Sequence, residues 1–307
     1  MTDTLATTPT LSLVVIVYKM ADQAERTLRS LSVAYQQGVR EEDYEVIVVE
    51  NASSWELGEA RACATGGNVR YFRREETQRT PVHAVNFGAA QARGSHVVIM
   101  IDGARMVTPG VVRLALDAFR IAPNAAVCVP GYHLGDKPQQ VAVNEGYDEA
   151  AEAKLLDQVA WPSDGYRLFE IAVFALSCAA GFFRPNHESN FLGLSLEKWN
   201  ALGGMDARYD DLGGGMANLE LYKRVLEAPE TPFYLLFGEG SFHQFHGGIS
   251  TNAPRGEREI VGRQIDEQDK ALRVDRTPPQ ARPILFGQLH PSAYRFMRQS
   301  LDGVYTP

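Results

Sequence analysis

Apolar residues in the first 130 positions come in short unbroken runs. Such runs are typical of strands that are buried on both faces, as in the centre of a parallel sheet. The predicted strands span residues 11–18, 44–49, 69–72, 96–101 and 126–130.

Between these runs, apolar residues recur at the three- and four-residue spacing of helices. The first helix is expected to begin at Asp22, which with Glu25 resembles a capping box, and to carry Leu28, Leu31 and Tyr35 on one face. Further helices are predicted from Trp55, after Thr80-Pro81, and after Thr108-Pro109 through Phe119. This alternation predicts an α/β fold with a doubly wound, mostly parallel sheet and helices on both faces.

The pattern weakens beyond residue 131. The polar stretch 131–166, with one helix expected at 148–159, is interpreted as a lid or an insertion over the sheet edge. Later elements are predicted at 189–194 (return strand), 197–202 (helix), after the glycine triplet 213–215 (helix) and 233–237 (strand). We expect one domain over 1–254, with a nucleotide-binding half at about 10–130 and an acceptor half at 131–254. A C-terminal helical extension is expected over 255–307.

Composition excludes several classes of partner. The net charge is −8 and no Lys/Arg-rich run exists, so neither nucleic acid nor an anionic membrane surface is an expected partner. The three cysteines are widely spaced in apolar surroundings, which favours reduced thiols over disulfides or a zinc site. The N-terminus has no signal-peptide pattern, and the longest apolar stretch, 171–183, is too short for an integral membrane segment. The sequence therefore predicts a cytoplasmic protein.

One carboxylate follows the most apolar run of the chain. Asp102 comes directly after Val97–Ile101, where it would lie at the carboxyl end of a buried strand. A carboxylate is costly to bury without a purpose, so Asp102 is expected to bind a ligand, with Gly103 allowing close approach to the backbone. A metal-nucleotide site would favour a second acid at Ala104, and none is present.

Polar residues also follow the first two predicted strands. Tyr18-Lys19 and Glu50-Asn51 should meet Asp102 at one edge of the sheet, which is the crevice where open α/β folds bind nucleotides. The first turn lacks G-x-G-x-x-G, and the chain has neither a P-loop nor a G-x-S-x-G elbow. A dinucleotide site, a P-loop site and an α/β-hydrolase nucleophile are therefore not expected.

These motifs together resemble the family 2 glycosyltransferases of GT-A fold. The resemblance rests on VVIVYK (14–19), VIVVENAS (46–53), NFGAAQARG (86–94), IDGAR (101–105) and GGMD (203–206). It covers roughly residues 10 to 250. The DGAR, GGGMANLE (213–220) and GEGSFHQFHGG (238–248) segments resemble a divergent bacterial subgroup of that family.

The resemblance implies a set of nucleotide-sugar-binding residues. Tyr18 and Glu50 would contact the nucleobase or ribose, and Asp102 would bind ribose or metal. Arg79, or else Arg74, would approach the base or the diphosphate. The full set is Val17, Tyr18, Glu50, Asn51, Arg79, Asn86, Asp102, Gly103 and Ala104. For Asn86, capping or bridging of loops is the stronger interpretation.

The chain departs from the family pattern at both catalytic points. Ala104 replaces the second acid of D-x-D, and the Glu-Asp pair that supplies the base falls on Ala217-Asn218 or on Gly214-Gly215. Inverting transfer still needs a carboxylate to deprotonate the acceptor. The candidate catalytic acids are Asp211, Glu188 and Glu220, with Asp210 also considered. Their other interpretations are a turn acid, a solvated loop acid and an i,i+4 partner of Arg224, respectively.

Two histidines near the end of the domain could complete a metal site. His243 and His246 are three residues apart beside glycines, a spacing that can place two imidazoles on one ion. With Asp102 they would hold a divalent cation, Mn2+ or Mg2+. Structural histidines are the alternative.

The leading hypothesis is a glycosyltransferase that moves a sugar from a nucleotide-diphosphate sugar donor to a glycan or small-molecule acceptor, inverting and metal-assisted. The missing acids favour an alternative from another class. In it, a catalytically silent GT-A module binds a nucleotide or glycan as a partner subunit. The sequence leaves a homo-oligomer open.

Overall fold

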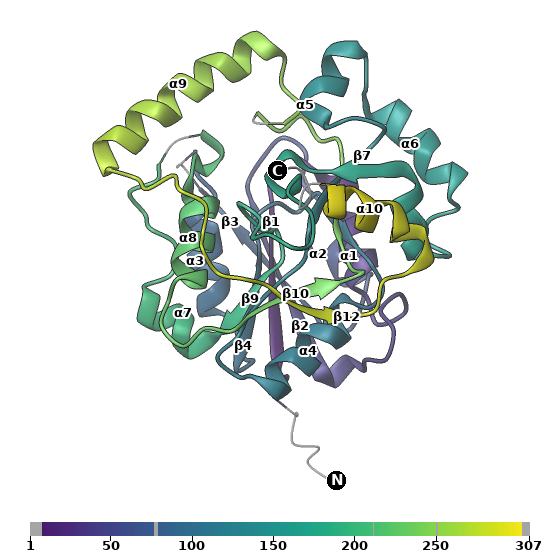
Figure 1. Cartoon of the computed structure of the whole chain (residues 1–307), viewed down its shortest axis with the longest axis vertical. Helices are drawn as coiled ribbons and strands as arrows, with labels where there is room; N and C mark the ends of the chain where they lie inside the picture. Colours follow the sequence, from purple (N-terminus) through teal and green to yellow (C-terminus); the bar gives the residue numbers. More distant parts are fainter. Residues whose placement is uncertain (1–7, 77–78, 211, 250, 303–307) are drawn as a thin grey trace.

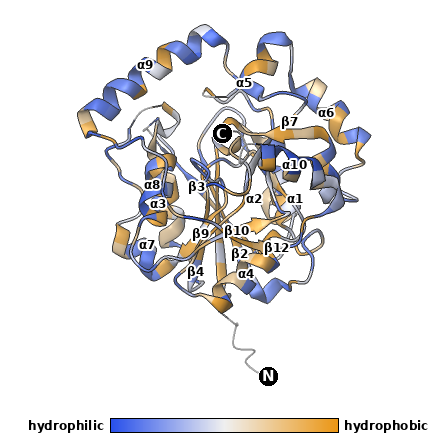
Figure 2. Cartoon of the chain, viewed as in Figure 1, coloured by the Kyte–Doolittle hydropathy of each residue, from blue (hydrophilic) through white to orange (hydrophobic). Residues whose placement is uncertain are grey.

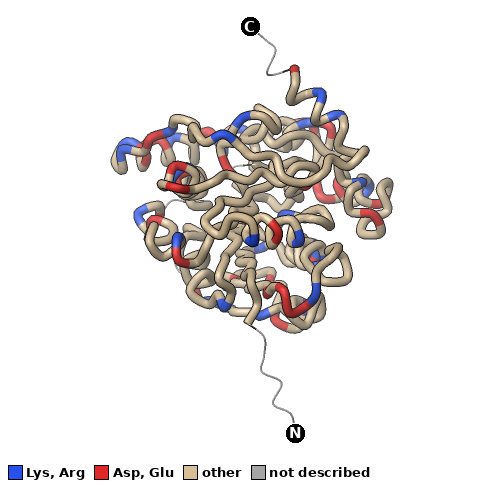
Figure 3. Tube along the Cα trace, turned by 60° about the horizontal axis from the view of Figure 1, so that its bottom comes forward, with Lys and Arg blue, Asp and Glu red and all other residues tan. Residues whose placement is uncertain are grey.

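Two β-sheets and the helices around them form the protein (Figure 1). The computed structural model describes residues 8–76, 79–210, 212–249 and 251–302. Apolar residues concentrate in the strands at the centre, whereas the outer helices carry many polar residues (Figure 2). Basic and acidic residues are interspersed along the chain (Figure 3). Within the described ranges, no helix combines the length and the apolar character needed to cross a membrane.

The larger sheet has eight strands in the order β12-β10-β6-β9-β4-β1-β2-β3. Their bounds are β1 Leu11–Val17, β2 Tyr44–Asn51, β3 Val69–Arg74, β4 His96–Met100, β6 Ala126–Cys128, β9 Leu192–Ser195, β10 Phe233–Phe237 and β12 Ile284–Gly287. Neighbouring strands are parallel except at β9, which runs antiparallel to β4 and β6. The predicted mostly parallel α/β sheet is confirmed, and β9 is its expected return strand.

Strand β1 shows why the apolar runs are continuous. Val14 and Ile16 face one hydrophobic core, and Leu13, Val15 and Val17 face a second core on the other side of the sheet. One face is covered by α1 (Ala21–Leu31), α2 (Glu59–Cys63) and α4 (Val111–Ile121), and the other by α3 (Val82–Ala90), α7 (Leu196–Leu202) and α8 (Ala217–Leu226). Because helices cover both faces of the sheet, neither face meets solvent, and the strand does not need to alternate apolar with polar residues.

The start of α1 differs from the prediction. Its N-cap is Met20, with no side-chain hydrogen bond, so the capping box expected at Asp22 and Glu25 is wrong. Both acids instead pair with Arg61 of α2. The helix ends at Leu31, and Tyr35 lies in the turn beyond it. The short helix expected from Trp55 is α2, which begins four residues later at Glu59.

A smaller sheet lies beside the carboxyl end of the larger one. It has the order β5-β11-β7-β8, with β5 Arg105–Val107, β11 Ser241–His243, β7 Gly131–Leu134 and β8 Ala172–Phe174. Strands β7 and β8 belong to the stretch where the sequence pattern is weak, because strands of three or four residues are too short to show a period. This sheet joins segments that lie more than 100 residues apart in the chain.

The remaining helices lie outside the two sheets. They are α5 Gln139–Ala142, α6 Glu149–Gln158, α9 Arg255–Leu272 and α10 Tyr294–Asp302, with 3-10 turns η1 Glu41–Asp43, η2 Val143–Glu145, η3 Gly165–Ile171, η4 Leu176–Cys178, η5 Leu212–Gly214 and η6 Pro291–Ala293. The helix expected at 148–159 is α6, capped by the Asp148 side chain. Strand β12 is a surprise, because the tail was expected to hold only helices and a proline-rich link; it pairs in parallel with β10 at the sheet edge.

Candidate metal and nucleotide-sugar site

Asp102 lies two residues beyond the end of β4, at the carboxyl edge of the larger sheet. Its Oδ1 accepts a hydrogen bond from the Ala104 amide at 3.0 Å, and its Oδ2 accepts one from Arg105 Nε at 3.2 Å. The carboxylate is therefore held by the residues that follow it. This is the edge at which open α/β sheets place their ligands.

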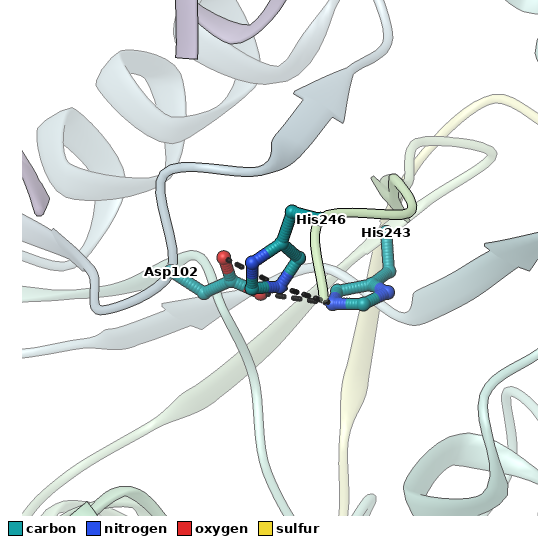
Figure 4. A group of neighbouring side chains, drawn as sticks. All are labelled: Asp102, His243 and His246. Carbon is teal, nitrogen blue, oxygen red and sulfur yellow. Dashed lines mark hydrogen bonds and ion pairs between the residues drawn. The ribbon is translucent and has the colours of Figure 1, made fainter. Parts of the chain in front are cut away.

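Two histidines from the far end of the chain meet this carboxylate (Figure 4). Nε2 of His243 lies 3.2 Å from Asp102 Oδ2, and Nε2 of His246 lies 3.7 Å from Asp102 Oδ1. The two Nε2 atoms are 3.2 Å apart. One ligand atom from each of the three residues falls within 4.8 Å of the others. The predicted convergence of Asp102 with the histidine pair is thus present in the geometry.

Gln139 of α5 determines which nitrogen of His243 faces the cluster. Its Oε1 lies 2.6 Å from His243 Nδ1 and also accepts from Asn252 Nδ2 at 3.0 Å. Its Nε2 donates to the His243 carbonyl at 3.1 Å, so the amide orientation is fixed. Because an amide oxygen only accepts, Nδ1 of His243 must carry the hydrogen. Nε2 then presents a lone pair to Asp102 and His246.

The protonation states agree with that assignment. Burial, together with the Arg105 guanidinium, lowers the pKa of His243 to about 3, and burial also lowers the pKa of His246. Burial alone would raise the pKa of Asp102, but His246 and His243, in their protonated form, and the Arg105 guanidinium hold it well below its usual range. At neutral pH the cluster is therefore a carboxylate with two neutral imidazoles.

This donor set suits a divalent cation. The Asp102 carboxylate carries no hydrogen, and neither does Nε2 of His243. His246 is therefore the only one of the three residues that could donate a hydrogen bond within the cluster. A cation satisfies all of them at once, and carboxylate oxygen with imidazole nitrogen is a common ligand set for transition metals. The hydrogen bond from His243 Nδ1 to Gln139 is also of the kind that orients metal-bound histidines.

The smaller sheet explains how the histidines are presented. His243 pairs across the strands with Arg105 on one side and His133 on the other, so these three side chains share one face. The opposite face carries Phe242 and Tyr132, whose rings stack at 5.1 Å within the core. The sheet thus buries an aromatic face and directs a basic, imidazole-rich face toward Asp102.

Sequence reasoning missed three residues of this arrangement, namely Arg105, Gln139 and His133. Nδ1 of His133 accepts a hydrogen bond from the backbone N–H of Gln139 at 2.9 Å, and the His133 ring lies 5.4 Å from the His243 ring. The repeated aromatic–histidine pairs, Tyr132-His133 and Phe242-His243, were the available signal.

Glu50 is engaged by the protein itself. Its carboxylate is fully buried and accepts hydrogen bonds from the amides of Leu57 and Gly58 and from the hydroxyl of Tyr71, at 2.7 to 2.9 Å. These bonds fasten the loop after β2. A direct contact to a nucleobase would have to displace one of them.

The neighbours of Glu50 are more open to a ligand. The Tyr18 side chain follows β1 and is 46% exposed. The Oδ1 atom of Asn51 is buried and has no hydrogen-bond partner among the described residues. Val17 is buried in the core, so only its backbone could meet a ligand. These residues occupy adjacent strand ends, as predicted.

Gly103 has a different reason for being glycine than the one expected. A Cβ atom there would lie 2.5 Å from the Ile16 carbonyl oxygen and 3.2 Å from Val17 Cγ2. The glycine thus permits close packing against β1, whereas the sequence had suggested close approach of a ligand. Ala104 is also buried, and its carbonyl accepts from the Gln244 amide at 2.9 Å.

Asn86 and Arg74 are engaged by the protein itself, whereas the Arg79 side chain is exposed. The Asn86 amide exchanges two hydrogen bonds with the Met205 backbone, both at 2.9 Å, as the bridging interpretation expected. Arg74 donates to the His83 carbonyl at 2.9 Å and lies over the Phe87 ring. The Arg79 side chain is exposed, so it is the freer of the two for an anionic ligand.

The candidate bases have very different environments. Glu188 accepts a hydrogen bond at 2.9 Å from Asn218, at the start of α8. Glu220 forms a two-bond ion pair with Arg224, at 2.7 and 2.9 Å, which matches its structural interpretation. Asp210 accepts from Gln268 at 2.8 Å on the surface. Asp211 lies outside the described residues.

The sequence model described as "Glycosyl transferase family 2" matches residues 12–187, more than half of the chain. The chain belongs to glycosyl transferase family 2. Among curated proteins, no sequence matches it.

Several solved structures share this fold at low sequence identity. The mannosyltransferase PcManGT from Pyrobaculum calidifontis, in complex with GDP-Man and Mn2+, is 18% identical, with a TM-score of 0.52 over 97% of this chain and 70% of that one. S. aureus TarS 1–349 in complex with UDP-GlcNAc is 12% identical, with a TM-score of 0.53 over 84% of this chain and 66% of that one. A longer S. aureus TarS structure is 10% identical, with a TM-score of 0.52 over 84% of this chain, which spans only 43% of that protein. These similarities establish the GT-A glycosyltransferase fold.

The first two positions of α8 hold no acid. They are Ala217 and Asn218, one of the two pairs of positions on which the family's Glu-Asp pair was expected to fall. The Asn218 amide nevertheless holds the carboxylate of Glu188, which comes from the loop before β9. A carboxylate thus lies at the start of α8, although a different segment provides it.

Proposed function

We propose that this chain transfers a sugar from a nucleotide-diphosphate sugar to an acceptor hydroxyl, with inversion and with help from a divalent cation. The observation that carries the proposal is the convergence of Asp102, His243 and His246 at the ligand-binding edge of a family 2 fold. PcManGT, of the same fold, was solved with GDP-Man and Mn2+, and TarS with UDP-GlcNAc. Residues 10–130 would form the nucleotide-binding half, 131–254 the acceptor half, and 255–307 an extension.

Asp102, His243 and His246 would hold the cation. Two imidazoles favour Mn2+ over Mg2+, because Mg2+ prefers an all-oxygen shell. A cation bound there would carry part of the negative charge that develops on the diphosphate as it leaves.

Glu188 is the proposed base. Its hydrogen bond from Asn218 orients the carboxylate and leaves its other oxygen free of protein hydrogen bonds among the described residues. In the reaction, Glu188 takes the proton of the acceptor hydroxyl, the acceptor oxygen bonds to C1 of the sugar, and the bond from C1 to the diphosphate oxygen breaks. A single displacement of this kind inverts the configuration at C1.

Tyr18 and Asn51 are the proposed nucleobase contacts. An exposed aromatic ring can stack on any base, whereas the unpartnered Oδ1 of Asn51 needs a hydrogen-bond donor. Uracil, thymine and guanine each have a ring N–H that can meet this need. The acceptor would be a glycan or a small molecule with a free hydroxyl.

The proposal is tested by incubating the protein with a panel of UDP-, GDP- and dTDP-sugars and Mn2+, and measuring release of the nucleoside diphosphate. We expect slow hydrolysis of one donor, loss of it with EDTA or in Asp102→Asn, and recovery when Mn2+ is returned to wild type. Asp117→Asn is the matched control, because Asp117 forms only surface ion pairs on α4. Nucleotide binding without turnover under any metal would contradict the enzyme and favour the silent module.

A further inference from the structure

Arg105 is the first residue of β5 and forms an ion pair with the carboxylate of the metal cluster. Its Nε donates to Asp102 Oδ2 at 3.2 Å, and only 8% of its side chain is exposed. Cross-strand pairing with His243 places the guanidinium on the same face of the smaller sheet as the imidazoles. A positive charge is thus built into a site that is expected to hold a cation.

Most of the hydrogen-bonding capacity of this guanidinium is unused. An arginine side chain offers five N–H donors, and only the one on Nε is bonded here within the described residues. The two terminal nitrogens are not among the fully buried polar atoms that lack a partner, so they keep some accessible surface. Four unbonded donors beside the partly exposed side chains of Asp102 and His246 are suited to an anionic ligand.

The guanidinium also lies toward the candidate base. Its Nη1 is beside Gly131, 3.7 Å from the position that a Cβ would take there, and the Cys178 thiol is 3.5 Å from that same position. The same thiol lies 4.0 Å from the backbone carbonyl oxygen of Glu188. Arg105 therefore contacts the metal cluster through Nε, and its Nη1 approaches the thiol beside the loop that carries Glu188.

The charges of the cluster favour a phosphate ligand. The charges of the Asp102 carboxylate and the Arg105 guanidinium cancel, and histidines bind a metal as neutral imidazoles, so a bound divalent cation would leave the cluster with two net positive charges. A second carboxylate at Ala104 would have reduced that charge. The loss of this acid and the presence of Arg105 act in the same direction, toward stronger attraction for a diphosphate.

We infer that Arg105 binds the phosphoryl oxygens of the donor's diphosphate and stabilises their charge as the sugar leaves. The inference rests on the proposed function. When the bond from C1 breaks, its electron pair passes to the β-phosphate oxygen, and the terminal N–H groups of Arg105 donate to the oxygens that share this charge. A planar fork of donors matches two phosphate oxygens at once, which lysine does not.

The test compares Arg105→Gln and Arg105→Lys with wild type by calorimetry. Three affinities are measured: Mn2+ alone, the best-bound of UDP, GDP and dTDP with Mn2+, and the corresponding nucleoside. We expect Arg105→Gln to weaken the diphosphate by roughly 10- to 100-fold, as for loss of charge-assisted hydrogen bonds, with the nucleoside unchanged. Mn2+ alone should bind as well or better, because a repelling charge is gone. Arg105→Lys should fall between.

The matched control is Arg70→Gln, which removes another arginine that pairs with a buried carboxylate, Glu45 at 2.7 Å, from the opposite end of the parallel strands. It should leave all three affinities unchanged. Diphosphate affinity within twofold of wild type in the Arg105 variants overturns the inference. An equal loss of Mn2+ affinity in Arg105→Gln also overturns it, because Arg105 would then only position Asp102. If Arg105→Gln does not fold, Arg105→Lys decides by the same criteria. If wild type binds no nucleoside diphosphate, the proposed function itself fails.

Discussion

The side-chain oxygen of Gln139 lies 2.6 Å from Nδ1 of His243, across 104 residues of sequence. Gln139 belongs to α5, in the stretch that the sequence presents only as a lid or an insertion. This contact fixes the hydrogen on Nδ1 and directs the lone pair of Nε2 toward Asp102. A segment outside the larger sheet therefore controls the chemical state of a candidate metal ligand.

Gln139→Leu should lower Mn2+ affinity by about 10- to 100-fold, because an outer contact that orients a ligand histidine is lost. Gln139→Glu should retain most of the affinity, since a carboxylate oxygen can accept the same Nδ1 hydrogen. Titration of Mn2+ followed by electron paramagnetic resonance measures both.

Gln36→Leu is the control for this pair. Gln36 is also a buried glutamine with hydrogen bonds through both ends of its amide, to Ser30, Thr108 and Val112, but it lies away from the metal cluster. Its loss should lower the melting temperature without changing Mn2+ affinity. Equal Mn2+ affinity in Gln139→Leu and wild type would show that the Gln139 contact is structural only.

Glu188→Gln should reduce kcat for sugar transfer by about 10²- to 10⁴-fold while donor affinity stays near wild type, because only proton removal from the acceptor is lost. The measurement needs the donor identified by the hydrolysis panel and a transfer assay with a hydroxyl acceptor. A variant that still transfers sugar at the wild-type rate would exclude Glu188 as the base.

Glu220→Gln tests whether Glu220, rather than Glu188, acts as the base. Glu220 is held by two bonds to Arg224, which in turn donates to the carbonyls of Leu202 and Gly204. Its loss should lower stability by about 1 kcal/mol, as for a part-buried ion pair, and leave most of the turnover. A kcat loss larger than that of Glu188→Gln would reverse the assignment.

The sequence predicts the larger sheet well because each of its central strands is a local signal. Residues 13–17 and 97–100 are apolar throughout, and burial on both faces is the only simple explanation. The sequence pattern does not predict β12, because it is an edge strand between prolines and half of its residues are exposed. The capping box at Asp22 is wrong because a long-range partner, Arg61, takes the carboxylate.

The candidate site is predictable in part for the same reason. Asp102 and the histidine pair are visible as residue types beside apolar runs or glycines. The hydrogen bonds that engage the Glu50 carboxylate are not visible in the sequence, because their donors come from a loop and a neighbouring strand. The place of Arg105 in the site is not predicted either, because its cross-strand partner, His243, lies 138 positions later and pairs through a three-residue strand.

Glu152 predicts a pH dependence of folding. Its carboxylate is buried under the metal-site loop, where it accepts from the Phe245 amide at 2.6 Å and the Tyr147 hydroxyl at 3.1 Å. Burial raises its pKa from 4.5 to about 7. Below pH 4.5 both states are protonated; between pH 4.5 and 7 the unfolded chain ionises first, so stability falls as pH rises, by about 3 kcal/mol in all.

Chemical denaturation at pH values from 4.5 to 8 measures this slope. Glu152→Gln should remove it, because an amide keeps the acceptor oxygen and cannot ionise. Glu149→Gln, on the exposed side of the same helix, should keep it. The prediction would be contradicted if the free energy of unfolding of the wild type did not fall over this interval. It would also be contradicted if Glu152→Gln and Glu149→Gln showed the same pH dependence.

Gly103→Ala should weaken the site by displacing Asp102. The added Cβ would lie 2.5 Å from the Ile16 carbonyl oxygen, which is backbone in the middle of the larger sheet and cannot easily move. We expect a loss of about 1–3 kcal/mol of unfolding free energy, as for overpacking in a core, together with lower Mn2+ affinity. Gly262→Ala is the matched control, because nothing lies within 4 Å of its added Cβ on α9. That helical substitution should instead raise stability by about 0.5–1 kcal/mol and leave Mn2+ affinity unchanged. Denaturation and Mn2+ titration of the two variants would contradict the packing role if both gained stability alike.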